Sequence, residues 1–474
     1  MDSFKKPSFI DALIPLVLLV ILLILSVAIF GSDSSYGPNQ IALIFSAGVV
    51  CIIGLKNGFK WHDLEQAMIH GISVSMGAIF ILLSVGALIG TWLLSGTVPT
   101  MIYLGLQILS PEWFYVAACL LSAIVAMSIG SSWTTAATIG VALIGIANGI
   151  GASSAIAAGA IISGAYFGDK ISPLSETTNL APAVAGSDLF EHIRHMLWTT
   201  VPSFIITLIL FTILGFTEHR DGTDVNVSHI QDIIMSTYDV SAIHLTPLFL
   251  LVLMAIKKLP AFPTIFIGAL VGAIWGIIFQ HDLLTKVAGS TQVIDQMTVV
   301  WTALFDGFTV STGDEVMDKL LSGGGMSGML NTTWLIMTAL MFGSVMEKVG
   351  LLAVFVKGIL KAAKSTGSLI TSTILTAFGT NLITADQYMS IVMPGRMYKE
   401  EYERRGLKNV NLSRALEDGG TITSPLIPWN TCGAYMAGVL LVSPLDYWQF
   451  AFFNLINPIL AIIFAYLGIK VLKR

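Results

Sequence analysis

Long apolar stretches follow one another along this chain, with short polar segments between them. Eight are long enough to cross a bilayer as a helix, which takes about 20 apolar residues. They lie near 9–30, 39–56, 70–94, 190–217, 240–258, 261–280, 326–348 and 444–472. Two further apolar regions, 112–187 and 367–442, are interrupted by polar, Gly-rich and Pro-rich clusters. The pattern predicts an all-α integral membrane protein.

Composition agrees with this prediction. The chain is 55% hydrophobic and only 11% charged, whereas soluble domains carry about 25% charged residues. Its 24 basic and 29 acidic residues give no basic excess that would attract nucleic acid. The first apolar run, Ala12–Phe30, is longer than the apolar core of a signal peptide and lacks a small-residue cleavage site, so we expect a retained helix.

Sequence features of the first half recur in the second half, in the same order. The recurring features are a Gly-hydroxyl cluster, a Ser-Pro dipeptide and a proline inside the last apolar run. The pairs are Gly130–Ser132 with Gly379–Asn381, Ser172-Pro173 with Ser424-Pro425, and Pro202 with Pro458. Their separations of 249, 252 and 256 positions are nearly constant. The chain is therefore predicted to contain two copies of one unit.

Each copy is expected to hold three spans, a re-entrant hairpin, a helix broken near proline and a last span. This gives about ten transmembrane helices, two of them discontinuous, and two re-entrant hairpins. The first repeat is placed at 1–217, with its hairpin at about 112–147 and its broken helix at about 152–187. An external linker, 218–239, leads to the second repeat at 240–474, with its hairpin at about 367–395 and its broken helix at about 413–442.

The distribution of basic residues predicts that the two repeats are inverted. With the N-terminus in the cytoplasm, 20 Lys and Arg residues fall inside. Outside lie only Arg220, Lys286 and Lys319, and Lys170 lies within the membrane. The loop after the hairpin is uncharged in the first repeat, at Asn148–Gly151, and basic in the second, at Arg396–Lys408. Equivalent loops thus lie on opposite sides, and both termini are cytoplasmic.

Inverted repeats with broken helices are the architecture of secondary transporters, whose sites lie near the bilayer midplane. Four polar clusters are expected to meet there, two hairpin tips and two helix breaks. Their oxygen-rich side chains suit Na⁺ by analogy with other hard cations, and half-helix N-termini favour anions, so a cation, a carboxylate or both could bind. The candidate residues are Ser131, Ser132, Thr134, Asp169, Ser172, Glu176, Thr177, Asn179, Thr380, Asn381, Asp386, Asp418, Thr421, Thr423 and Ser424.

Carboxylates at membrane depth are costly and usually functional. Asp169 has the alternative of an ion pair with Lys170, although neighbours in a helix do not face each other. Glu176 could instead be a solvated loop carboxylate. Glu417 and Asp418 follow a basic loop and could cap a helix near the surface.

The segment Gly164–Ala181 resembles the signature of NhaC-type Na⁺/H⁺ antiporters of the ion transporter superfamily. Gly379–Asn381, Asp386–Tyr388 and Pro394–Tyr398 are similar to that family's second-half hairpin. The resemblance implies a bacterial-type cytoplasmic (inner) membrane antiporter that binds Na⁺ at Asp169, Asp386 and nearby hydroxyl and amide groups. Many relatives carry Asp where this chain has Glu176, which puts its role as a direct ligand in doubt. Some members of the family resemble malate–lactate exchangers.

We therefore predict a transporter that exchanges cytoplasmic Na⁺ for external H⁺ by alternating access. The alternative is a Na⁺- and H⁺-coupled organic-anion antiporter for malate and lactate. A passive channel is disfavoured by the paired broken helices, and an enzyme by the lack of a His, Cys or Ser–Lys arrangement. No cofactor is expected. The expected partners are Na⁺, H⁺, small carboxylates in the alternative, membrane lipid and a second copy of the chain, without nucleic acid.

Overall fold

The computed structural model describes residues 5–108, 110–218, 227–257 and 259–474. Within these ranges the protein is helical and forms only two isolated β-bridges. Arg220 and residues 219–226 of the predicted linker lie outside the described residues.

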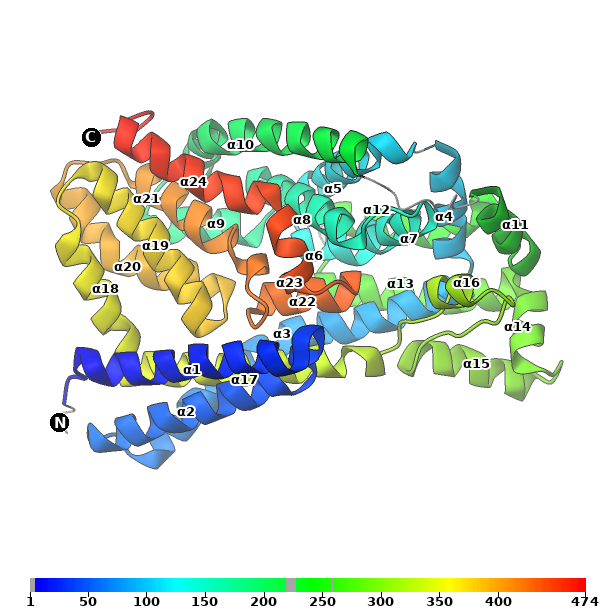
Figure 1. Cartoon of the computed structure of the whole chain (residues 1–474), viewed down its shortest axis with the longest axis horizontal. Coiled ribbons are helices and arrows are strands. Elements are labelled where there is room, and N and C mark those ends of the chain that lie inside the picture. Colours follow the sequence, from blue (N-terminus) through cyan, green and yellow to red (C-terminus); the bar gives the residue numbers. More distant parts are fainter. Residues whose placement is uncertain (1–4, 109, 219–226, 258) are drawn as a thin grey trace.

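Helices of the first half follow the predicted order (Figure 1). They are α1 (Phe9–Phe30), α2 (Pro38–Lys56), α3 (Trp61–Leu94), α4 (Thr97–Ile108), α5 (Phe114–Ile129), α6 (Ser132–Thr135), the π-helical turn η3 (Ala136–Gly140), α7 (Val141–Gly149), α8 (Ser154–Ile171), α9 (Glu176–Ala185) and α10 (Leu189–Thr217). Thus α5 and α6–α7 form the hairpin at 112–147, and α8 and α9 form the broken helix at 152–187.

The second half repeats this order with α11 added before its first span and α14, α15 and α16 added between its second and third spans. Its helices are α11 (Val227–Thr237), α12 (Thr246–Ile256), α13 (Ala261–Phe279), α14 (His281–Ala288), α15 (Val293–Phe305), α16 (Glu315–Leu320), α17 (Leu330–Val349), α18 (Leu351–Ala362), α19 (Thr366–Thr384), α20 (Gln387–Arg404), α21 (Asn409–Leu416), the π-helical turn η6 (Glu417–Thr421), α22 (Thr431–Leu440), α23 (Pro444–Tyr447) and α24 (Phe452–Leu467). The hairpin is α19–α20, and the broken helix is α21–η6 with α22.

Membrane-spanning helices are recognised by their length and apolar composition. Seven helices in the described residues pass this test, and nine pass if each of two bent pairs is one span. One of the nine is hairpin arm α5. The other eight, two of which are bent pairs, and the two broken helices together make up the predicted ten. On α1, apolar side chains such as Ile10, Ile24 and Ile29 are exposed, as expected of a helix that faces lipid.

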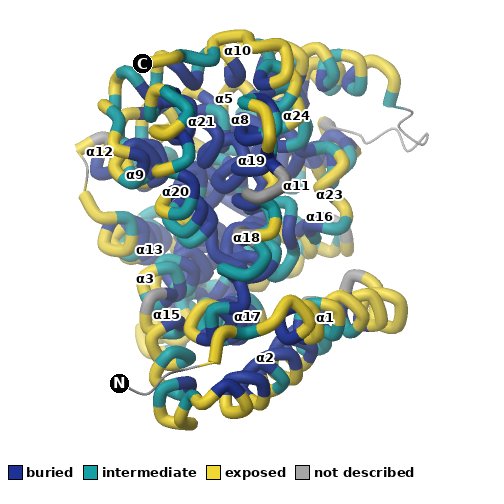
Figure 2. Tube along the Cα trace, turned by 90° about the vertical axis from the view of Figure 1, so that its left-hand side faces the viewer, coloured by how far each residue is buried: buried dark blue, intermediate teal, exposed yellow. Residues whose placement is uncertain are grey.

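The helices form two groups, seen one above the other in Figures 1 and 2. The lower group contains α1, α2, α3, α13, α15 and α17, and the upper group contains the hairpins, the broken helices, α10 and α24. Packing within and between the groups is reciprocal. Helix α3 packs on α13 while its counterpart α17 packs on α2, and α10 packs on its own counterpart, α24. This exchange of partners is what a pseudo-two-fold axis produces.

Caps and turns of the two halves match at a constant separation of 255 positions. Ser131, Ser175 and Asp188 are helix N-caps whose side chains accept backbone N–H groups, and so are their counterparts Asp386, Asn430 and Ser443. The left-handed turn at Gly130 corresponds to that at Ala385. The duplication predicted from sequence therefore extends to the capping residues, while the bounds 1–217 and 240–474 stay a prediction.

Two details of the sequence interpretation need adjustment. Residues 281–325, where the sequence shows no apolar stretch of membrane-spanning length, contain the helices α14, α15 and α16. The second hairpin reverses at Ala385 and Asp386, after α19 ends at Thr384. The equivalent of Gly130 is therefore Ala385, and the pairing of Gly130 with Gly379 was out of register by six positions.

Candidate functional site

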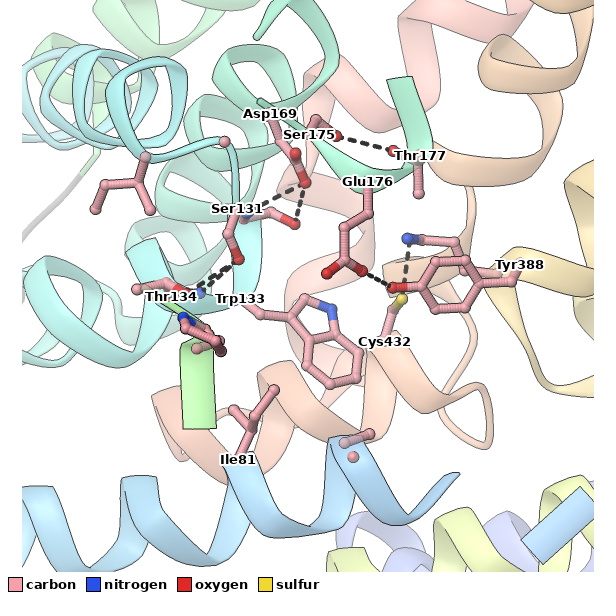
Figure 3. A pocket seen from close by; sticks show the side chains of 18 of the residues that line it. Ile81, Ser131, Trp133, Thr134, Asp169, Ser175, Glu176, Thr177, Tyr388 and Cys432 are labelled. Carbon is pink, nitrogen blue, oxygen red and sulfur yellow. Dashed lines mark hydrogen bonds between the residues drawn. The ribbon is translucent and has the colours of Figure 1, made fainter. Parts of the chain in front are cut away.

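A cavity of about 620 Å³ lies where the two groups of helices meet (Figure 3). One wall consists of the first hairpin tip, the break between α8 and α9, and the starts of α20 and α22. The facing wall comes from α3, α17 and the α12–α13 connection, through residues such as Ile81, Leu340 and Pro260. The cavity is thus lined by both halves of the chain.

Asp169 of α8 is bound to the first hairpin tip through hydrogen bonds from Ser132. The backbone N–H of Ser132 donates to Oδ2 of Asp169 at 3.1 Å, and the Ser132 hydroxyl donates to the same oxygen at 2.7 Å. Both residues are buried, and both line the cavity. A carboxylate offers about four lone-pair positions, so Asp169 keeps acceptor capacity for a cation after these two bonds.

Asp386 occupies the corresponding tip of the second hairpin. The left-handed Ala385 ends α19, and the Asp386 side chain then caps α20 by accepting the Met389 N–H at 2.8 Å. A carboxylate at this position is stabilised by the helix dipole. Asp386 is buried and lines the same cavity as Asp169. Each repeat therefore places one carboxylate in the cavity: Asp386 from the second hairpin tip, and Asp169, which is bound by Ser132 of the first hairpin tip.

Glu176 connects the two repeats across the cavity. It begins α9, and its carboxylate accepts a hydrogen bond from the hydroxyl of Tyr388 on α20 (Figure 3). Trp133 lies beside them and stacks on Tyr435, with 4.1 Å between ring centroids. Glu176 thus lines the cavity, and its side chain is engaged by Tyr388.

Seven of the predicted site residues line the cavity, and the others lie behind it. The seven are Ser131, Ser132, Thr134, Asp169, Glu176, Thr177 and Asp386. The others are Ser172, Asn179, Thr380, Asn381, Asp418, Thr421, Thr423 and Ser424. Most of these hold backbone in place. Ser172 donates to the Met127 carbonyl at 2.9 Å, and Asn179 donates to the Pro173 carbonyl at 2.9 Å.

The second break is held in the same way by side chains behind the cavity. Asn381 donates to Thr423 at 3.1 Å. Ser424 donates to Oε1 of Gln387 at 2.9 Å. Asp418 is fully buried and pairs with Lys170. The alternative in which Lys170 neutralises Asp169 is therefore not what the structure shows, because these adjacent residues point to different partners.

Several lining residues were not among the predicted set. Ser175, Trp133, Gln387, Tyr388 and Cys432 line the cavity. All but Cys432 lie inside the polar segments already singled out, so they could have been identified by their position next to a predicted residue. The lining residues of α3, α13 and α17 gave no such signal because they are ordinary small or apolar residues of long spans.

The chemistry of the lining favours a cation. Among the described residues, the charged side chains that line the cavity are Asp169, Glu176 and Asp386, and none is basic. No three His, Cys, Asp or Glu side chains of the described chain are grouped as a transition-metal site. The available ligands are single carboxylates with Ser and Thr hydroxyls and backbone carbonyls. This set of hard oxygens suits an alkali cation.

Comparison with known proteins shows similarity over nearly the whole chain. Residues 164–469 match the Na+/H+ antiporter family. The Na(+)/H(+) antiporter NhaC of Alkalihalophilus pseudofirmus is 40% identical, over 92% of this chain and 91% of its own length. The malate-2H(+)/Na(+)-lactate antiporter of Bacillus subtilis is 39% identical, over 91% and 90%. The arginine/ornithine antiporter ArcD of Halobacterium salinarum is 37% identical, over 100% and 95%.

Proposed function

The chain belongs to the Na⁺/H⁺ antiporter family, as its signature segment predicted, and from this premise we propose that it exchanges cytoplasmic Na⁺ for external H⁺ by alternating access. It acts in a cytoplasmic (inner) membrane with both termini inside. Na⁺ binds in the cavity, where Asp169 and Asp386 supply negative charge and Ser131, Ser132 and Thr134 supply hydroxyl oxygens.

One observation carries this proposal. Buried carboxylates from the two repeats, Asp169 and Asp386, line one cavity that contains no basic side chain among its described residues. A buried uncompensated carboxylate is strongly disfavoured unless it binds a cation or a proton. Such a site is stable when it holds Na⁺, and when Na⁺ leaves, a proton bound at the site or close to it restores the charge balance, so the two cations compete. Competition of this kind is the minimal requirement for antiport.

The test uses the full chain reconstituted in vesicles. We expect Asp386→Asn to abolish Na⁺ uptake driven by a pH gradient while the protein stays folded, because asparagine is also a good helix N-cap. Asp446→Asn, which changes an exposed carboxylate, is the matched control and should transport normally. Wild-type exchange in Asp386→Asn would show that Asp386 is not part of the ion site.

Exchange of small carboxylates is the second candidate, favoured by the similarity to the malate-2H(+)/Na(+)-lactate antiporter. In this cavity a carboxylate substrate would need Na⁺ or H⁺ to offset Asp169, Glu176 and Asp386. We therefore expect any malate uptake in exchange for lactate to require Na⁺. Uptake of labelled malate by lactate-loaded vesicles, with and without Na⁺, measures this. Malate uptake would assign the protein to carboxylate exchange, whereas Na⁺ movement alone would leave simple Na⁺/H⁺ antiport.

A further inference from the structure

A second charged cluster lies behind the cavity, between the two broken helices. Lys170, at the end of α8, is fully buried and forms an ion pair with Asp418 of the η6 turn. Asp418 also accepts a hydrogen bond from Asn457 at 2.8 Å and one from Thr199 at 3.3 Å. Asp418 is thus a well-compensated buried carboxylate.

Its neighbour Glu417 differs in this respect. Glu417 has 0% exposure, and among the described residues no donor meets either of its carboxyl oxygens with hydrogen-bond geometry, the Thr421 hydroxyl beside it included. An ionised carboxylate that is buried without donors is strongly disfavoured, whereas the neutral acid loses far less on leaving water. The surroundings of Glu417 thus favour the neutral, protonated acid over the carboxylate.

Groups of both signs surround Glu417. Lys170 pairs with Asp418, Arg414 lies one turn earlier on α21, and Asp169 acts on Glu417 from the cavity side. Other titratable groups on the elements around the turn include His192 and His195 of α10, Tyr398 and Tyr402 of α20, and Glu176 at the cavity end of α9. Helices α19 and α24, which also pack against the turn, add no Asp, Glu, Lys, Arg or His.

We propose that Glu417 binds the transported proton, at a site separate from the Na⁺ site on Asp169. This inference rests on the proposed Na⁺/H⁺ exchange. The charges of Asp169 and Glu417 act on each other. Na⁺ on Asp169 removes one negative charge, so Glu417 can release its proton. When Na⁺ leaves, the bare carboxylate of Asp169 favours return of the proton to Glu417. The two sites together hold one monovalent cation, and the result is one-for-one exchange.

Glu417→Gln in the reconstituted full chain tests this assignment. Glutamine keeps the size of the side chain and resembles the protonated acid, but it cannot release a proton. Two fluxes are measured, exchange of labelled Na⁺ for unlabelled Na⁺ at equal pH, and Na⁺ uptake driven by a pH gradient. We expect Na⁺/Na⁺ exchange to persist and to lose its pH dependence, and uptake driven by the pH gradient to be lost. Glu400→Gln, at an exposed position of α20, should behave as wild type.

Other results would overturn the assignment. If the Glu417→Gln protein still takes up Na⁺ in response to a pH gradient, Glu417 is not the proton site. Loss of both fluxes in a folded Glu417→Gln protein would exclude Glu417 as well. If Glu417→Gln does not fold, Glu417→Asp serves instead. Coupled exchange with a displaced pH profile would support the assignment, and an unchanged profile would reject it. A wild-type protein that performs Na⁺/Na⁺ exchange but no Na⁺/H⁺ exchange would instead refute the proposed function.

Discussion

The buried pair of Lys170 and Asp418 joins the two broken helices, and its contribution to stability can be predicted from its surroundings. Lys170→Met keeps an unbranched side chain and removes the charge. Asp418 then retains only Asn457 and Thr199 as donors. Removing one partner of a buried pair costs about 3–5 kcal/mol, because the other charge is left uncompensated. We expect Asp418→Asn alone to cost a similar amount, since it strands the ammonium group of Lys170.

The double variant Lys170→Met/Asp418→Asn separates the charge effect from the packing effect. Neither charge remains, and only polar groups with imperfect partners are left, which cost about 1–3 kcal/mol. The double variant should therefore be at least as stable as either single variant, and the two changes should be coupled by at least about 2 kcal/mol.

Unfolding in mixed micelles, followed by the fluorescence of the 10 tryptophans, measures all four proteins of this cycle. Equal unfolding midpoints for wild type and Lys170→Met would refute the reasoning. So would strictly additive effects, with a coupling below about 0.5 kcal/mol, because the pair would then not be a mutually dependent buried unit.

Two further changes test the packing of α8 and the contact across the cavity. Gly168→Ala would place a Cβ 2.2 Å from the Ala123 carbonyl oxygen of α5, so we expect the yield of folded protein to fall sharply. Gly379→Ala is the control, because a Cβ there would have no described atom of another element within 4 Å, and it should be neutral or slightly stabilising. Comparable yields of the two variants by size-exclusion chromatography would contradict this. Tyr388→Phe removes the donor to Glu176. Because the Glu176 carboxylate is exposed and can be solvated instead, we expect a cost of only about 0.5–1.5 kcal/mol, seen as a lower unfolding midpoint, and an unchanged midpoint would show that this contact contributes nothing.

Much of the fold was predictable because a bilayer imposes a simple length requirement on apolar segments. Helix α1 has the predicted bounds, and both hairpins and both breaks lie where polar clusters interrupt apolar sequence. Helices α14, α15 and α16 were missed because each is shorter than a membrane span. The register between the two hairpin turns was wrong because Ala385 adopts the left-handed conformation that usually calls for glycine.

The candidate site was only partly predictable, for a different reason. Asp169 and Asp386 stand out as carboxylates in apolar sequence, and both line the cavity. Nothing local in the sequence shows that Lys170 pairs with Asp418, which is 248 positions away, or that Glu417 meets no donor with hydrogen-bond geometry among the described residues. Such facts depend on which helix faces arrive together after folding. The cavity-lining residues of α3 and α17 could not be predicted either, because they are of the same types as those of any buried span.

The ion pair between the breaks also limits how the protein can move. Lys170 belongs to one broken helix and Asp418 to the other, and both side chains are sealed from solvent. Separating them would strand two charges in a dry interior, so displacement of one break carries the other with it. We therefore expect the two broken helices to move together as one unit. If one group of helices slides on the other to open the cavity to alternate sides, we expect that movement to take place along α3 and α17 and not between the two breaks.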